Sequence, residues 1–217
     1  MKINNLGQSN SLVSQYLSEL RDRSIQKDSL RFRRNLERIG ELFAYEISKT
    51  LDYEPREVET PLGIATCNVI SDQIVISTIL RAGLPIHEGF LNMFDKAENA
   101  FVATYRKYGK DNKCTMQLEY SSTPAIEGKT LIVCDAMIAT GASLLMTYNS
   151  LLENGTPKHT HIACPIASAD GVEYLSRNLP HHHVTLWVGA IDEELTNKSF
   201  IIPGIGDVGD LAFGCKI

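Results

Sequence analysis

The segment from residue 131 to residue 155 predicts a strand, a short loop and a helix, and it restricts the fold more than any other stretch. Leu131-Ile-Val-Cys134 is apolar and of mostly β type, and Asp135 and a loop of small residues follow it. Residues 144–153 have helical spacing, and Gly155 stands where helix ends favour glycine. This arrangement is typical of an α/β protein with a mostly parallel sheet flanked by helices.

The loop from Asp135 to Ser143 has the residue types that bind a phosphorylated sugar. Its N–H groups and the positive end of the following helix dipole suit a phosphate, and Asp135 can accept hydrogen bonds from ribose hydroxyls. Thr140 and Ser143 add hydroxyl donors, and Gly141 lets the backbone approach a ligand closely. An ordinary turn between a strand and a helix carries similar residues, so this segment alone leaves both interpretations open.

A second strand end carries an arginine. The apolar run 73–79 is followed by Leu80-Arg-Ala-Gly-Leu-Pro85, which suits a tight loop presenting the Arg81 guanidinium to an anion. A surface arginine over a β-turn is the alternative. Two such loops in one open sheet favour a ligand, because ligands of these sheets bind outside the carboxyl ends of the strands.

The C-terminal stretch 200–214 combines glycines, aspartates and flanking aromatic residues. Its apolar residues can be buried while its glycines leave main-chain donors and acceptors exposed. This favours a loop that folds over the sheet and recognises a small planar ligand through its backbone. A glycine-rich tail that simply packs on the body is the alternative.

Three motifs resemble those of uracil phosphoribosyltransferases in order and spacing: ILRAGLP (79–85), DAMIATGAS (135–143) and IIPGIGDVGDLAFG (201–214). Residues 20–24, 32–33 and 45–46 are similar as well. The resemblance implies a type I phosphoribosyltransferase-like fold in a single domain, 1–217. Within it, residues 1–50 would form a helical extension and residues 191–217 a base-binding hood.

The resemblance also implies transfer of the phosphoribosyl group of phosphoribosyl diphosphate to uracil, giving UMP and diphosphate in pyrimidine salvage. The implied catalytic residues are Arg81, Arg106, Asp135 and Asp207. The same four residues would bind the donor together with Ala136, Met137, Ile138, Ala139, Thr140, Gly141, Ala142 and Ser143. Uracil would contact Ile201, Gly206, Asp207 and Val208. After Arg106, Lys107-Tyr-Gly-Lys110 replaces acidic residues of the family.

The implied cofactor is Mg²⁺, held mainly by the substrate and not directly by protein ligands. A homo-oligomer, dimer or tetramer, and a GTP effector are further implications. A pyrimidine-responsive regulatory protein of the same fold, with weak or no catalysis, is the alternative function. A net charge of −5 argues against broad nucleic-acid binding. The polar N-terminus and the short apolar runs predict a cytoplasmic protein without membrane contact.

The remaining chain alternates between helical and strand patterns. We expect helices near 9–22, 28–50, 86–93, 143–154 and 170–179, and strands near 63–70, 73–80, 100–105, 131–134, 161–166 and 183–190. Residues 107–123 should form a hairpin or flap. The second helix should bury Leu30, Leu36, Ile39, Phe43 and Ile47.

Several residues that suggest metal binding have simpler interpretations. His181, His182 and His183 are adjacent and cannot converge on one ion, so a polar loop is expected there. Of the five cysteines, Cys134 and Cys164 lie in apolar runs and should be reduced core residues. Trp187 should also lie in the core.

Overall fold

The computed structural model describes residues 1–108 and 114–215, and the side chains of residues 105–116 lie outside the description. Its centre is a sheet with strand order β1-β10-β9-β7-β4-β5-β6, and the short strand β8 pairs with β9. All pairings are parallel except that of β5 with β6. The strands are β1 (Lys2–Asn5), β4 (Ile74–Leu80), β5 (Glu98–Tyr108), β6 (Cys114–Ser122), β7 (Thr130–Cys134), β8 (Met137–Ile138), β9 (His159–Ser168) and β10 (Val184–Asp192).

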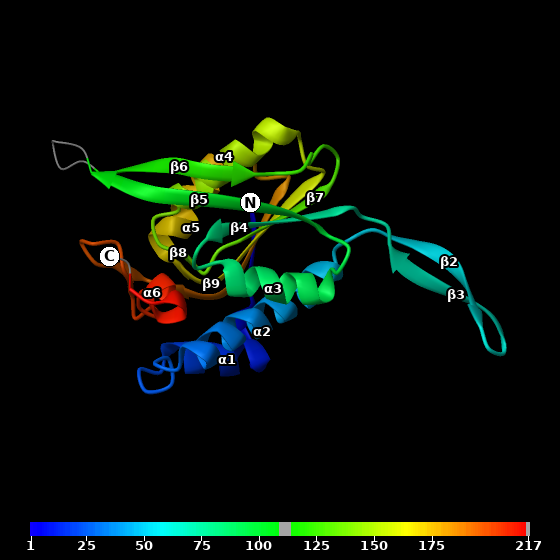
Figure 1. Ribbon diagram of the computed structural model, residues 1–217, viewed down its shortest axis with the longest axis horizontal. Coiled ribbons are helices and arrows are strands. Elements are labelled where there is room, and N and C mark those ends of the chain that lie inside the picture. Colours follow the sequence, from blue (N-terminus) through cyan, green and yellow to red (C-terminus); the bar gives the residue numbers. More distant parts are fainter. Residues whose placement is uncertain (109–113, 216–217) are drawn as a thin grey trace.

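Helices cover both faces of the sheet, as Figure 1 shows. One face carries α1 (Leu12–Arg21), α2 (Ser29–Ser48) and α3 (Leu84–Met93), and the other carries α4 (Ala142–Leu151) and α5 (Ala169–Asn178). The buried strand β7 serves both layers, since Ile132 and Cys134 pack toward the first set of helices and Leu131 and Val133 toward the second. Burial on both faces explains why the central strands are continuously apolar.

Residues 194–214, within the region predicted as a hood, lie beside the first layer and are called the hood from here on. The hood consists of a two-stranded sheet, β11 (Glu194–Leu195) with β12 (Ile201–Ile202), and the short helix α6 (Val208–Phe213). The described residues also form two 3₁₀ turns, η1 (Leu6–Gln8) and η2 (Leu152–Asn154). None of the described helices combines the length and apolarity that a membrane span requires.

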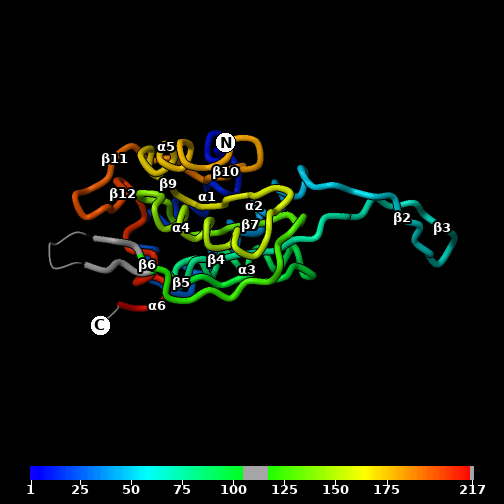
Figure 2. Tube along the Cα trace, turned by 90° about the horizontal axis from the view of Figure 1, so that it is seen from above, coloured from blue at the N-terminus to red at the C-terminus, as the bar shows by residue number. Residues whose placement is uncertain are grey.

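The α/β architecture with a mostly parallel sheet is confirmed, and the structure differs from the expectation at two places in the N-terminal half. The N-terminal extension is not wholly helical, because its first residues form β1 and add a strand beside β10. The predicted strand 63–70 exists as β3 (Gly63–Ile70), but it pairs with β2 (Tyr53–Thr60) outside the central sheet. This hairpin, here called the arm, leaves the body of the molecule (Figure 2).

The expectations about core residues and about residues 181–183 are confirmed, with one exception. Trp187, Cys134 and Cys164 are buried, and residues 181–183 form an exposed turn before β10. Leu30 was wrongly assigned to the core. It is 62% exposed, whereas Phe32, two residues further along α2, is buried.

Helices α2 and α3 pack with their backbones in near contact. A Cβ built on Gly89 would lie 2.0 Å from the carbonyl oxygen of Glu37, and one on Gly40 would lie 2.5 Å from that of Ile86. The two glycines therefore set the distance between the helices. Because α3 begins directly after the β4 loop, this packing also fixes the position of Arg81.

The first prediction concerns this helix contact. Alanine normally favours a helix interior over glycine by about 1 kcal/mol, yet we expect Gly89→Ala to destabilise the protein by roughly 1–3 kcal/mol through overpacking. Urea unfolding measures the difference. Glu88→Ala, at the exposed neighbouring position, is the control and should change stability little. A Gly89→Ala protein as stable as the wild type would show that the two backbones are not in close contact.

Candidate functional site

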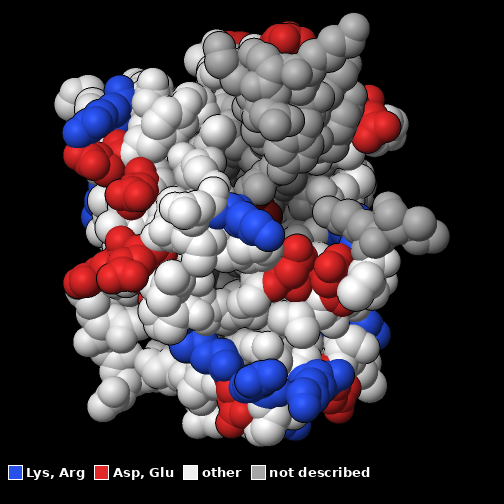
Figure 3. All heavy atoms as spheres, turned by 90° about the vertical axis from the view of Figure 1, so that its left-hand side faces the viewer, with Lys and Arg blue, Asp and Glu red and all other residues white. Residues whose placement is uncertain are grey.

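The candidate site lies where the chain direction across the sheet reverses. Strands β4 and β7 are neighbours, with Thr78 opposite Cys134, so Arg81 and Asp135 follow adjacent strand ends. From β4 the chain passes through α3 to β5, and from β7 it passes through α4 to β9 on the other side. Open parallel sheets bind ligands at such a switch point. This face, seen in Figure 3, carries basic and acidic side chains close together instead of a patch of one sign.

Asp135 is a partly buried carboxylate at the end of β7. One of its oxygens accepts a hydrogen bond from the N–H of Ala136 at 2.7 Å. Removal from water raises the pKa of Asp135 to about 7, although hydrogen bonds from the loop backbone act in the opposite direction. The carboxyl group is therefore harder to ionise than that of an exposed aspartate. Hydroxyl donors of a ligand would stabilise its charged form.

The loop after Asp135 offers mainly its backbone to a ligand. Ala136 and Ile138 are buried, so their side chains belong to the core. Met137 and Ile138 form β8 and pair with Ile166 and Ala167 of β9. This pairing fixes the first half of the loop, and the sequence analysis did not foresee it.

The second half of the loop leads into α4. Thr140 is exposed, and its hydroxyl accepts from the N–H of Ala142 at 3.4 Å. Gly141 has φ +77° and precedes the first helical residue, with no side-chain cap on the helix. The first N–H groups of a ten-residue helix thus point out of the sheet edge beside Asp135. These are the features of an anion-binding helix start.

Two residues that the sequence analysis missed support this loop. The hydroxyl of Ser168 donates to the carbonyl of Ala139 and accepts from the N–H of Gly171 at 2.9 Å. A Cβ on Gly171 would lie 2.4 Å from the same carbonyl oxygen. Ser168 caps α5, and a serine between a strand and a helix was the available signal.

Arg81 joins the loop after β4 to the hood. Its Nη2 donates to the carbonyl of Gly214 at 3.1 Å and lies 3.6 Å from Oδ1 of Asp210. Its Nε is buried and has no hydrogen-bond partner in the described part of the chain. The guanidinium is partly exposed, so it can still donate to an incoming anion.

The hood combines side chains that are buried in the core with an exposed stretch of backbone. Ile201, Ile205 and Val208 are buried against the helical layer, whereas Gly206 and Asp207 are exposed. Gly206 has φ +81°, which only glycine adopts without strain. Asp207 is the N-cap of α6, and its carboxylate accepts from the N–H of Asp210 at 3.1 Å. The site residues thus fall into three groups: the loop after Asp135, Arg81, and the hood.

The side chain of Arg106 lies outside the described residues. Its backbone belongs to β5, opposite Met116 of β6, and the antiparallel pairing confirms the predicted hairpin up to residues 108 and 114. The role of Arg106 therefore stays a prediction.

Two neighbouring histidines, His159 and His161, lie near the amino end of β9, away from the candidate site. His161 is buried, and its Nδ1 accepts from the indole N–H of Trp187 at 3.1 Å. Burial lowers the pKa of His161 to about 3, so this ring is neutral. His159 contacts the hydroxyl of Thr185 at 2.9 Å. Both side chains line a hollow of about 300 Å³ near the amino ends of the strands.

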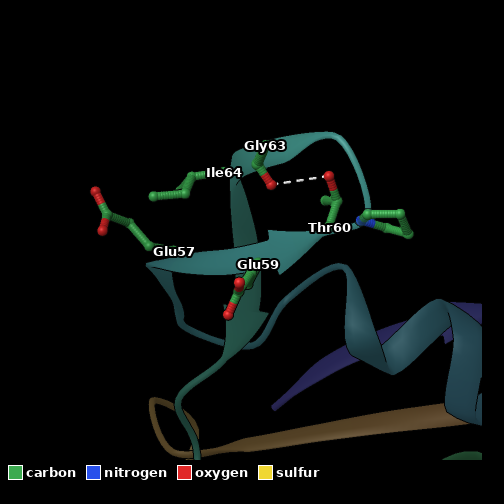
Figure 4. A pocket seen from close by; sticks show the side chains of 6 residues that line it. Glu57, Glu59, Thr60, Gly63 and Ile64 are labelled. Carbon is green, nitrogen blue, oxygen red and sulfur yellow. Dashed lines mark hydrogen bonds between the residues drawn. The ribbon is translucent and has the colours of Figure 1, made fainter.

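A second hollow, of about 650 Å³, lies at the end of the arm (Figure 4). Its lining is entirely exposed, and there the Thr60 hydroxyl donates to the carbonyl of Gly63 at 2.8 Å. Neither hollow touches Arg81, the loop after Asp135, or the hood.

Comparison with known proteins identifies the family to which this site belongs. Residues 8–215 match the family model described as uracil phosphoribosyltransferase. A relative in Porphyromonas gingivalis with that name is 50% identical over 217 residues, which cover both chains completely. A solved structure of a protein from Aquifex aeolicus is 29% identical, with a TM-score of 0.87 and 99% of each chain covered.

A more distant likeness supports the fold alone. A hypoxanthine phosphoribosyltransferase structure from Staphylococcus aureus aligns with a TM-score of 0.50 at 12% identity, over 78% of this chain and 83% of that one. The sheet, its switch point and the helices on both faces are thus those of type I phosphoribosyltransferases. Taken with the family match over nearly the whole length, they show that this chain belongs to the uracil phosphoribosyltransferase family.

Proposed function

We propose that this chain uses the switch-point site to transfer the phosphoribosyl group of phosphoribosyl diphosphate to uracil, releasing diphosphate and forming UMP. One observation supports the assignment of these residues to a single site. The loop from Asp135 to Ser143 and Arg81 follow adjacent strands, and Arg81 contacts the hood that would hold the base. The sites for phosphoribosyl diphosphate and for uracil thereby lie next to each other at the carboxyl ends of the strands.

Phosphoribosyl diphosphate is held through its two ends. The N–H groups at the start of α4 and the hydroxyl of Thr140 bind the 5-phosphate, and Asp135 accepts from the ribose hydroxyls. Arg81 binds the diphosphate, with Arg106 as its partner from the flap. The transition state places positive charge on the sugar and negative charge on the leaving diphosphate. The site positions both reactants and stabilises these charges, so no covalent nucleophile is required.

Uracil is read by the hood backbone. One edge of the base presents a carbonyl, an N–H and a second carbonyl, and the complementary edge must offer donor, acceptor and donor. The backbone of Ile201 and of Gly206-Asp207-Val208 supplies these groups from buried anchors. Cytosine would set an amino donor against a backbone donor and leave buried groups unpaired, at roughly 1–3 kcal/mol each.

Mg²⁺ fits this site as an ion held mainly by the substrate. The described residues contain no group of three or more histidine, cysteine, aspartate or glutamate side chains that could hold a metal. Oxygen atoms of the diphosphate and ribose are hard ligands of the kind that Mg²⁺ prefers. Bound there, the ion would neutralise charge on the leaving diphosphate.

We also propose that the protein is a cytoplasmic homo-oligomer, a dimer or a tetramer. Exposed apolar residues on the arm support association, with Leu62 fully exposed and Ile64 73% exposed. The arginines of α2 give less support, because Arg31, Arg33, Arg34 and Arg38 all have partners within the chain. GTP as an effector is a proposal from the family resemblance, and a thermal-shift titration with GTP tests it.

The function and the role of Asp135 are tested together by diphosphate release from phosphoribosyl diphosphate and uracil. Asp135→Asn keeps the acceptor for Ala136 but loses the charge. We expect kcat/KM to fall by about 10- to 150-fold, which corresponds to about 1.5–3 kcal/mol for a charged hydrogen bond. Asp170→Asn, at an exposed position of α5, is the control and should keep full activity. A wild-type value of kcat/KM in Asp135→Asn would show that Asp135 is not part of the site.

The raised pKa of Asp135 also predicts a pH-dependent stability. The folded carboxyl binds its proton more tightly than the unfolded one, so this group lowers stability as the pH rises from about 4 to about 7. Asp135→Asn should therefore be more stable than the wild type at pH 8, by at least about 1 kcal/mol, and equally stable at pH 4. Urea unfolding at both pH values measures this. A less stable variant at pH 8 would contradict it.

Replacing Arg81 and replacing Arg106 should change the kinetics to different extents. Arg81→Ala should raise the KM for phosphoribosyl diphosphate and lower kcat, each by roughly tenfold or more, because a leaving-group contact acts in both ground and transition states. Arg81→Lys should restore part of the loss. Arg106→Ala should have the smaller effect, since the residues after it depart from the family. Equal or reversed effects in steady-state kinetics would show that the flap has a different role.

The hood backbone is tested at Gly206. Gly206→Val places a β-branched side chain at φ +81° on an exposed edge, so we expect uracil binding to weaken by roughly tenfold or more. Phosphoribosyl diphosphate should still raise the melting temperature. Gly128→Val is the matched control, because Gly128 has φ +69° in open space before β7, away from the hood.

Val208→Ala keeps the same main-chain groups but is a poorer control, since Val208 is buried in the core and its truncation lowers stability. If Gly206→Val leaves the uracil KM unchanged, or removes donor binding instead, the base site lies elsewhere.

A further inference from the structure

An ion pair outside the three groups of site residues holds the hood to the body. Asp192 is the last residue of β10 and is only 7% exposed, and Arg21 is the last residue of α1. Nη1 of Arg21 donates to Oδ2 of Asp192 at 2.8 Å, and Nη2 donates to Oδ1 at 2.7 Å. This is the two-pronged geometry in which a guanidinium binds a carboxylate most strongly.

The same two side chains hold Gly204 at both of its backbone groups. Nη1 of Arg21 also donates to the carbonyl of Gly204 at 3.0 Å, and the N–H of Gly204 donates to Oδ2 of Asp192 at 2.9 Å. Gly204 is buried with φ +57°, and a Cβ there would lie 2.2 Å from the carbonyl oxygen of Ile201. These two hydrogen bonds and the close packing hold the backbone of Gly204 in place against the ion pair.

Gly204 lies between the two parts of the hood that would read uracil. Ile201 precedes it by three residues, and Gly206 follows it by two. The glycines at 204 and 206 make this stretch intrinsically flexible. A donor–acceptor–donor edge discriminates only when its groups keep their spacing, so a restraint on Gly204 would add to the anchoring of Ile201 and Val208 in the core.

A second ion pair, between α1 and α2, provides a comparison because it does not contact the hood. Arg31 of α2 also binds a carboxylate with two bonds, donating to Glu19 of α1 through Nε and Nη2 at 2.9 Å each. Glu19 also accepts from the side chains of Gln15 and Asn35, so the hydrogen bonds described for this pair stay within α1 and α2. Both arginines thus bind a carboxylate through two bonds, but only Arg21 also contacts the hood.

We propose that Arg21 and Asp192 are positioning residues for base recognition, which hold Gly204 so that the backbone from Ile201 to Val208 keeps the spacing that reads uracil. This inference rests on the proposed function. The N-terminal helices therefore take part in selecting the base, without touching it. Breaking the pair should loosen the hood while leaving the phosphate loop intact, because that loop is held by β9 and Ser168.

Steady-state kinetics of Arg21→Met and Arg31→Met test the proposal. We expect Arg21→Met to raise the uracil KM by roughly 10- to 100-fold while the KM for phosphoribosyl diphosphate changes by less than about threefold. Arg31→Met should change neither KM, although it also loses a two-pronged ion pair. Equal effects of the two variants on the uracil KM, or a matching rise of the donor KM in Arg21→Met, would overturn the proposal.

Two further measurements cover other outcomes. If Arg21→Met does not fold, Arg21→Lys keeps the charge without the fork, and we expect an intermediate uracil KM with an unchanged donor KM; an unchanged uracil KM would overturn the proposal. Hydrogen exchange of residues 201–208 reports on the hood without any turnover. Exchange there should accelerate in Asp192→Asn and Arg21→Lys but not in Arg31→Met. If wild-type protein makes no UMP, the proposed function fails, whereas unchanged exchange in both hood variants overturns the positioning role itself.

Discussion

The parallel pairing of β4 with β7 is the constraint on which the rest of the site depends. It brings two strand ends together at the point where the chain turns to opposite sides, so that α3 and α4 cover opposite faces of the sheet. Arg81 and Asp135 thereby come from segments more than fifty residues apart yet follow neighbouring strands. No local sequence preference could bring these residues together without this register.

Much of the site is built from backbone groups whose side chains are buried. Ala136 and Ile138 anchor the phosphate loop in the core, and Ile201 and Val208 anchor the hood. Burial of such side chains contributes on the order of 1.5–3 kcal/mol each for the larger ones, and it fixes the main chain without using polar side chains. The main-chain groups of these two segments are therefore held in place, which is what the proposed electrostatic stabilisation of a developing charge requires. Glycine is needed where that backbone must take a left-handed conformation, as at Gly141 and Gly206.

The sequence was most informative where a local pattern and the tertiary structure agree. The apolar run before Asp135, the loop of small residues and the helical run after it predicted β7, the following loop and α4, because each part has its own local signal. The arm was misread, since its strand 63–70 carries apolar residues that the chain itself does not bury. Leu30 was misassigned because it lies roughly 120° around α2 from Leu36, at about 100° per residue, whereas Phe32 lies roughly 40° from Leu36 and is buried.

Contacts between distant segments could not be predicted in this way. Arg21 and Asp192 are separated by most of the chain, and neither has a local signal for the other. Ser168 supports the phosphate loop from a different strand, and only the pairing of β8 with β9 reveals it.

Backbone amide resonances provide the most direct test that the phosphate loop and the hood form one site. Transverse-relaxation-optimised spectra of labelled protein can be recorded with ribose 5-phosphate and then with UMP. The account predicts that ribose 5-phosphate shifts amides of residues 139–143, and that UMP shifts these and also those of residues 206–208. Shifts by UMP that leave the hood unchanged, or that centre on the hollow beside His159 and His161, would contradict it.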